Sequence, residues 1–102
     1  MRFDMPRDEV IAKLKAVEPA LRAHGAAALY LFGSYARNEA QPGSDVDVFI
    51  DNDRSRKFGF DEFMDIYFIL RERLGVDVDY GTREGLHPFL RQQIERDAIR
   101  VF

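Results

Sequence analysis

Aspartates alternate with valine at two places in the chain, from Asp45 to Asp51 and from Val76 to Tyr80. Alternate residues of a strand project from one face, so these carboxylates can gather there, although aspartate is poorly suited to strands. Crowded carboxylates raise one another's pKa unless a cation neutralises them, and their oxygens suit octahedral Mg²⁺. The pattern indicates a magnesium site. The alternative is that Asp45 and Asp47 only solvate an exposed face.

A Gly-Ser pair, Gly33-Ser34, lies between the apolar run Ala27 to Phe32 and a short helix expected to start at Tyr35. The unpaired N–H groups at a helix start can hold an anion. Glycine lets a phosphate approach the backbone, and serine adds a hydroxyl donor. A helix cap with a glycine turn is the structural alternative. Beside the aspartates, the pair predicts a phosphate site next to a metal site.

These motifs together resemble a known signature. Gly33-Ser34 followed after a ten-residue gap by Asp45-Val46-Asp47 is similar to the DNA polymerase β-like nucleotidyltransferase superfamily. Leu-Phe-Gly-Ser-Tyr-Ala-Arg at 31–37 and Ser-Asp-Val-Asp-Val at 44–48 resemble its minimal nucleotidyltransferase (MNT) domains, over nearly the whole chain. Residues 78–88 match more loosely. Asn38 replaces the family's glycine, and because asparagine tolerates a left-handed backbone we expect the turn to survive.

The resemblance implies a catalytic and metal-binding triad and a nucleotide site. The triad would be Asp45, Asp47 and Asp79, holding two Mg²⁺ ions. The residues binding ATP, the nucleotide donor, would be Gly33, Ser34, Arg37 and Ser44. Arg37 is equally compatible with a surface salt bridge.

The third carboxylate has two candidates, Asp79 and Asp77, which share one face of the expected strand. The family-like Val-Asp-hydrophobic context favours Asp79 as the base that takes the proton of an attacking hydroxyl. His87, before Pro88, also matches the family pattern, but a structural role is the simpler interpretation.

Hydrophobic periodicity predicts the elements that position these residues. An amphipathic helix from about Asp4 carries Pro19, so we expect a kink or two short helices ending near His24-Gly25. A second helix spans Phe60 to Leu74 and ends at Gly75, and a last helix runs from Pro88 through Ile99 into the C-terminus. The expected fold is α/β: a small mixed β-sheet with helices packed mainly on one face, the polymerase β-like nucleotidyltransferase fold.

Composition narrows the class of protein. With 102 residues, 46% of them hydrophobic, we expect a single domain over residues 1–102. A net charge of −3 argues against direct nucleic-acid binding, and the absence of cysteine excludes thiol chemistry. No apolar run approaches the ~20 residues of a membrane span, so we expect a cytoplasmic protein.

The sequence therefore favours a metal-dependent nucleotidyltransferase that moves AMP from ATP to a hydroxyl. The resemblance to MNT domains implies an antitoxin in a hetero-oligomer with a HEPN ribonuclease toxin, whose tyrosine is the acceptor. One alternative is a non-catalytic binding module that neutralises its partner by steric contact. Another is a small nucleotidyltransferase acting on RNA or a small molecule.

Overall fold

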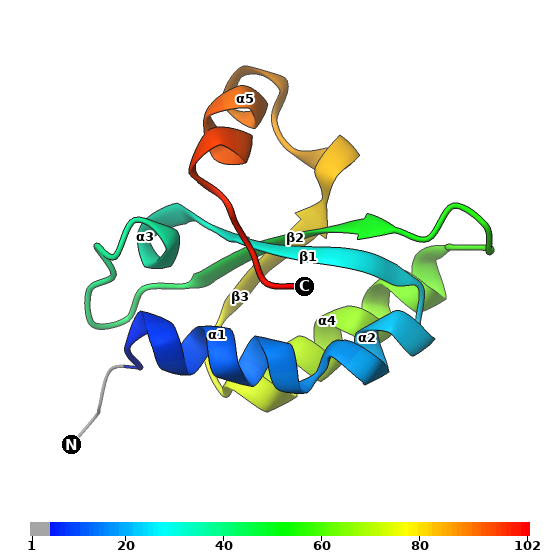
Figure 1. The fold of residues 1–102 in the computed structure, drawn as a ribbon, viewed down its shortest axis with the longest axis horizontal. Coiled ribbons are helices and arrows are strands. Elements are labelled where there is room, and N and C mark those ends of the chain that lie inside the picture. The colour runs from blue at the N-terminus through cyan, green and yellow to red at the C-terminus, as the bar shows by residue number, and fades with distance from the viewer. Residues whose placement is uncertain (1–4) are drawn as a thin grey trace.

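The computed structural model describes residues 5–102 and contains a four-stranded mixed sheet (Figure 1). Its strands are β1 (Ala26–Phe32), β2 (Val46–Asn52), β3 (Val78–Thr82) and β4 (Ile99–Arg100), in the order β3-β2-β1-β4. β1 is antiparallel to both β2 and β4, whereas β2 and β3 are parallel. The parallel pair requires a crossover connection, which the chain makes through a helix.

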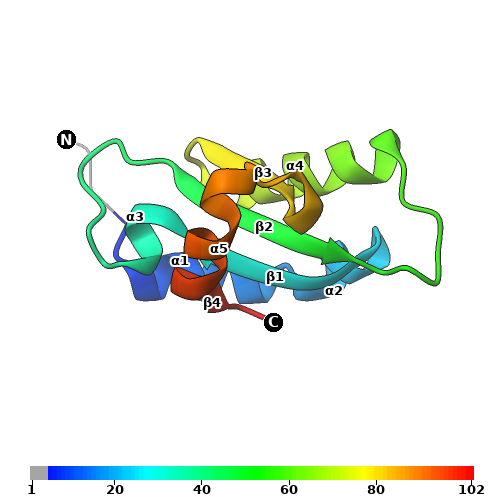
Figure 2. The ribbon, with the colours of Figure 1, turned by 90° about the horizontal axis from the view of Figure 1, so that it is seen from above.

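The helices divide unequally between the two faces of the sheet. One face is covered by α1 (Arg7–Ala16), α2 (Glu18–Ala23) and α4 (Phe60–Leu74), as Figure 1 shows. The short α3 (Gly33–Ala36) continues β1, and α5 (Pro88–Asp97) follows the 3₁₀ turn η1 (Arg83–Gly85). Seen from above, α5 lies on the face opposite to α1, α2 and α4 (Figure 2). The expectation of helices mainly on one face is confirmed.

The hydrophobic core lies between the sheet and the three helices. Val46, Val48 and Ile50 alternate along β2, face the helices and are fully buried. Ile66 and Leu70 of α4 are buried against them. The remaining face of β2 therefore presents its aspartates to the side that carries α5.

Local signals account for several helix ends, although the expected helix start at Asp4 lies outside the described residues and α1 begins at Arg7. Pro19 follows a break at Val17 and stands in the first turn of α2, so the first helical segment is two short helices. α4 ends at Gly75, whose left-handed φ of 71° forms the C-cap. Asn38 likewise adopts a φ of 60°, and the turn after α3 is kept.

The prediction of a last helix running through Ile99 was wrong. α5 ends at Asp97, Ala98 is extended, and Ile99 belongs to β4. Residues 99–102 extend the sheet: the Val101 N–H donates to the Leu29 carbonyl at 2.8 Å, and the Leu29 N–H donates to the Phe102 carbonyl at 3.2 Å. Ile99 matched the helical spacing, but pairing with β1 satisfies the backbone there instead.

Two other boundaries differ from expectation by two residues. α3 starts at Gly33 rather than Tyr35, and β3 starts at Val78 rather than Val76. Within residues 5–102, no helix is both long and apolar enough to cross a bilayer.

Candidate active site

Asp47 and Asp79 face each other across the parallel strands β2 and β3. The register pairs Asp47 with Asp79 directly, and paired strands lie about 4.8 Å apart, so the two carboxylates are neighbours on the face opposite the core. Asp77 precedes β3, and its Oδ1 lies 3.2 Å from Nη2 of Arg71. Of the two candidates for the third carboxylate, Asp79 is thus the one beside Asp47.

Asp47 is the most strongly perturbed carboxylate of this group. Burial, followed by the negative charges of Asp79 and Asp45, raises the pKa of Asp47 from 3.8 to about 6, and Arg37 opposes the shift. The ionised form of Asp47 is disfavoured because its side chain is partly shielded from water and lies near two other negative carboxylates. A bound cation would relieve that repulsion.

Asp45 is less closely associated with the carboxylates of Asp47 and Asp79. It stands before the first residue of β2, is exposed, and lines a surface hollow together with Ser44, Arg71 and Asp77. Within residues 5–102, no three carboxylate or histidine side chains converge on a ready-made metal site. The donor set is still chemically suited to Mg²⁺, because the neighbouring groups are hard carboxylate oxygens and Arg37 compensates the charge of Asp47 only in part.

Gly33 is tied directly to Asp47. Its φ is +72°, and a methyl group placed on it would lie 2.0 Å from Oδ2 of Asp47. β1 and β2 pair Phe32 with Asp47, so α3 begins immediately beside that carboxylate. Glycine is therefore required at this position both by the backbone and by the space that Asp47 occupies.

The other predicted nucleotide-binding residues lie in different settings. Ser34 is half-buried in the first turn of α3. Nε of Arg37, at the C-cap of α3, donates to Glu39 at 2.7 Å. The Ser44 hydroxyl accepts a hydrogen bond from the Gln41 N–H at 2.8 Å and closes the turn before β2. The fold therefore brings Gly33, at the start of α3, to Asp47, whereas Arg37 is paired with Glu39 and Ser44 is engaged in a turn.

Two clefts flank α5 on this face. The first, of about 270 Å³, is lined by Gly33 and Arg37 at the phosphate motif and by Gln93 and Asp97 of α5. The second, of about 290 Å³, contains Asp79. The two clefts share the side chains of Phe32, Leu90 and Ile94. α5 thus separates a space beside the Gly-Ser pair from a space beside Asp79.

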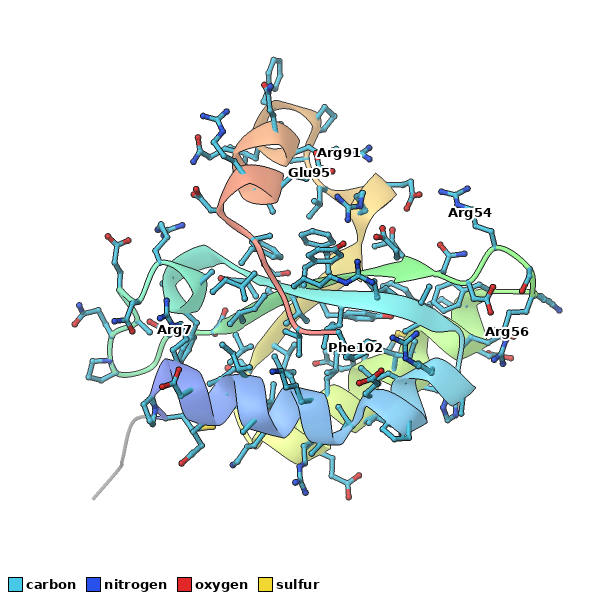
Figure 3. The ribbon with its side chains drawn as sticks, viewed as in Figure 1. Arg7, Arg54, Arg56, Arg91, Glu95 and Phe102 are labelled. Carbon is cyan, nitrogen blue, oxygen red and sulfur yellow. The ribbon has the colours of Figure 1, made fainter. Side chains whose placement is uncertain are left out.

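Sequence reasoning missed Arg83, which holds α5 in place. Its guanidinium donates to Oδ1 of Asp51 at 2.7 Å, to Oδ2 at 2.9 Å and to Glu95 of α5 at 2.6 Å. It also lies 4.8 Å above the ring of Tyr30 and 4.9 Å above that of Phe49. Glu95 lies on the side of α5 that faces the sheet (Figure 3).

The available signal for this network was Asp51, on the same strand face as Asp47, but its partners are distant in sequence. The pKa of Asp51 is lowered, chiefly by its hydrogen bonds with Arg83. His87, by contrast, has the structural role expected: its Nδ1 accepts from the Phe89 N–H at 3.2 Å and caps α5.

Comparison with known proteins assigns this arrangement to a family. Residues 14–101 match the sequence profile of the nucleotidyltransferase domain, which covers the Gly-Ser pair and every predicted carboxylate. The chain belongs to the nucleotidyltransferase domain family. A candidate protein adenylyltransferase of Methanocaldococcus jannaschii is 38% identical over 72 residues, 70% of this chain and 72% of the relative.

Solved structures agree with the expected fold. A minimal nucleotidyltransferase superimposes with a TM-score of 0.79 at 34% identity, over 96% of this chain and 98% of the other. A chain from the complex of an MNT antitoxin with the tri-AMPylated HEPN toxin of Shewanella oneidensis gives a TM-score of 0.65. That match, at 18% identity over 94% of this chain and 71% of the other, concerns the fold alone. The predicted resemblance to minimal nucleotidyltransferases is confirmed.

Proposed function

We propose that this nucleotidyltransferase is a metal-dependent protein adenylyltransferase that moves AMP from ATP to a hydroxyl of a partner protein. The observation that carries the proposal is the contact between the phosphate motif and the acidic group. Gly33 leaves room for the Asp47 carboxylate, and Asp79 lies beside Asp47 on the neighbouring strand β3. A triphosphate at the Gly-Ser pair would therefore reach the carboxylates.

Each residue has a role in this proposal. Asp45, Asp47 and Asp79 would hold Mg²⁺, which when bound neutralises charge that develops on the entering and leaving oxygens. The first N–H groups of α3, at Gly33 and Ser34, would bind the triphosphate. Its charge would also attract Arg37, and the Ser44 hydroxyl would bind it from the turn before β2. Asp79 accepts the proton of the attacking hydroxyl.

The proposed partner is a HEPN toxin, with one of its tyrosines as the acceptor and this chain as the antitoxin. Two findings support this choice. The Methanocaldococcus jannaschii relative is a candidate protein adenylyltransferase, and the same fold occurs in a complex with an AMPylated HEPN toxin. The proposed assembly is a hetero-oligomer in which the partner supplies the acceptor.

The test is the intact mass of the protein that co-purifies with this chain from its native host, after incubation with ATP and Mg²⁺. We expect the partner to gain whole adenylyl units with the wild type and none with Asp47→Asn. Asp8→Asn makes the same chemical change on the exposed surface of α1 and should behave as the wild type.

The outcome also separates catalysis from neutralisation by contact alone. If the partner stays bound and inactive with no mass change in either variant, the enzyme assignment fails and the steric binding module is supported. Peptide mapping of the modified partner then tests the acceptor, because adenylylation at a residue other than tyrosine contradicts that part of the proposal.

A further inference from the structure

The outer edge of β3 has no neighbouring strand in the described part of the chain, because β3 ends the sheet on one side. The Val46 N–H of β2 donates to the Asp77 carbonyl at 3.0 Å, and in a parallel ladder every second residue bonds to the neighbouring strand. The backbone N–H and C=O groups of the alternate residues, Val78, Tyr80 and Thr82, therefore point away from β2. Such a row of groups is a template for pairing with a further strand.

Helix α4 places an apolar stripe beside this open edge. Phe60 and Phe68 are 76% and 59% exposed, although both side chains are large and hydrophobic. At about 3.6 residues per turn, they share one side of α4 with Met64 and Tyr67, and we call these residues the α4 stripe. The ring of Tyr67 stacks on that of Tyr80 in β3 at a centroid distance of 6.4 Å, so the stripe adjoins the edge of the sheet. Exposed apolar patches of this kind mark interaction sites.

The edge and the stripe form one surface. β3 and α4 lie together at the side of the molecule away from β4 and the C-terminus (Figure 2). The edge offers hydrogen bonds and the stripe offers apolar area, so a well-matched partner supplies a strand edge and an apolar helix side together. This chain itself contains both. A second copy, turned about a two-fold axis at the sheet edge, presents the same two elements in return.

A two-fold axis at Tyr80 satisfies the open edge of β3. Antiparallel strands exchange hydrogen bonds at every second pair of residues. With Tyr80 opposite its own copy, Val78 lies opposite Thr82 of the second copy, and these are the residues whose backbone groups point outward. An axis at Asp79 would set two carboxylates directly against each other, which is destabilising. An axis at Gly81 would leave Val78 beyond the end of the opposite strand.

The same axis keeps the acidic residues of the open face apart. Asp79 lies opposite Gly81 of the second copy, and a glycine adds no side chain over that carboxylate. The two copies of Asp79 are diagonal neighbours, about 7–8 Å apart, and are not directly opposed. The candidate active sites therefore stay open beside the joined strands.

The charges of α4 suit an antiparallel pair of helices. Its first turn carries Asp61 and Glu62, and its last turn carries Arg71 and Arg73. The axis that pairs the β3 edges makes the two copies of α4 antiparallel, so the acidic turn of each lies toward the basic turn of the other. Opposite charges thus meet at both ends of the α4 stripe. This complementarity of the chain with itself favours a second copy as the occupant.

We propose that two copies of this chain associate through the outer edge of β3 and the α4 stripe, forming a two-fold dimer whose sheet runs through both copies. The inference goes beyond the proposed function and does not depend on it. Because the axis is perpendicular to the sheet, both candidate active sites lie on the same face of the joined sheet.

The first test is the oligomeric state of the full chain, measured by sedimentation equilibrium over a wide range of concentration. We expect a monomer–dimer equilibrium for the wild type. Phe68→Arg should weaken the dimer about tenfold or more, because it places a charge in a contact that excludes water. Phe89→Arg makes the same change on α5, where Phe89 is 91% exposed, and should leave the dissociation constant unchanged. Circular dichroism checks that both variants keep the fold.

Exchanging charges tests how the helices are arranged. Asp61→Arg and Arg71→Glu should each weaken the dimer, because like charges then meet at both ends of the α4 stripe. An equal mixture of the two variants should dimerise again, since every facing pair has opposite charge once more. Hydrogen exchange tests the strand edge. The amides of Tyr80 and Thr82 should exchange more slowly as the wild type dimerises and stay fast in Phe68→Arg.

Several results would overturn the assignment. These are a wild type that stays monomeric at the highest concentration, equal weakening by Phe68→Arg and Phe89→Arg, and a dimer in which the Tyr80 and Thr82 amides still exchange fast. A mixture of the two charge variants that stays monomeric contradicts the antiparallel helix pair. If the wild type is monomeric and Phe68→Arg loses the co-purifying partner, the surface belongs to that partner instead.

Discussion

Asp47 is half-buried, and the carboxylates of Asp79 and Asp45 both act on it. Because its pKa is raised from 3.8 to about 6, the folded protein binds the proton of Asp47 more tightly than the unfolded chain does. The contribution of Asp47 to the unfolding free energy therefore falls as the pH rises from about 4 to about 6, and stays lowered above that. The ionised carboxylate of Asp47 thus reduces stability at neutral pH, a cost that its role in the proposed function would account for.

Replacing Asp47 should accordingly separate stability from activity. We expect Asp47→Asn to melt at a higher temperature than the wild type at pH 7–8, with the difference vanishing near pH 4. AMP transfer should fall by more than the 10- to 100-fold typical of residues that only support a metal ligand. Thermal unfolding across this pH range checks the first part, and a melting temperature below that of the wild type at pH 7 would contradict it.

The collision between Gly33 and Asp47 gives a second prediction. Gly33→Ala should destabilise the protein by at least about 1 kcal/mol more than Gly75→Ala, because both place alanine at a φ near +70° but a methyl group meets the Asp47 carboxylate only at position 33. Urea unfolding of the two variants measures the difference. Equal losses would mean that Asp47 moves aside without cost.

Single-residue predictions from the sequence succeeded where the signal was local. Asn38 was expected to accommodate a left-handed backbone, and its φ is 60°. The choice between Asp77 and Asp79 depended on the register of β2 and β3, which no local pattern fixes. The two aspartates share one face, and a shift of the register by two residues would place Asp77 instead of Asp79 beside Asp47.

Arg83 acts at the scale of elements, since it joins β2 to α5 through Asp51 and Glu95. None of the residues of α5 is buried, so polar contacts carry much of its attachment to the sheet. The second cleft, between α5 and β3, therefore depends on a side chain that follows β3 rather than on a packed core.

We expect Arg83→Met to loosen α5 without unfolding the sheet. Hydrogen exchange over residues 88–97 should accelerate by about tenfold, and the unfolding free energy should fall by roughly 1–2 kcal/mol, because charged hydrogen bonds are lost from a partly solvated pair. Arg83→Lys should keep little of the stabilisation that Arg83 gives to α5, since a lysine cannot donate to Asp51 in the bidentate geometry.

Arg91→Met is the matched control for the Arg83 variant. Arg91 lies on α5, and its Nε lies 3.6 Å from a carboxylate oxygen of Glu95, one turn further along the same helix, so this ion pair stays within α5 instead of joining it to the sheet. Exchange in α5 should stay near the wild-type rate in this variant. If both variants accelerate it equally, Arg83 has no special part in holding the helix.

Helices with strong periodicity were predicted well, and the elements held by distant partners were not. The spacing of apolar residues from Phe60 to Leu74 and the stop at Gly75 are local properties, and α4 has these bounds. β4 is two residues long and owes its existence to pairing with β1, so a helical spacing at Ile99 was misleading.

At the scale of the whole molecule, the core and the candidate site lie on opposite faces of one sheet. The three helices α1, α2 and α4 bury the apolar side of β2, and Asp47 projects from its other side. Composition and patterning predicted this division, since the valines and aspartates of β2 alternate. They did not predict that α5 divides the open face into two clefts.

This separation makes core substitutions affect stability before chemistry. Leu70 is fully buried in α4, and we expect Leu70→Ala to lower the unfolding free energy by about 2–4 kcal/mol. At temperatures where the variant remains folded, AMP-PNP should bind it within about twofold of the wild-type affinity. Calorimetric unfolding and a binding titration check the two halves, and a large loss of affinity in the folded variant would show that the faces are coupled.

The place of β4 also bears on how the protein is made. β1 leaves the ribosome before residues 99–102, which cover its second edge. Until then the nascent chain carries an apolar strand with unpaired backbone groups along one side. The second edge of β1 therefore stays open during translation until residues 99–102 emerge. Until then, any chaperone or neighbouring chain able to add a strand can pair with it.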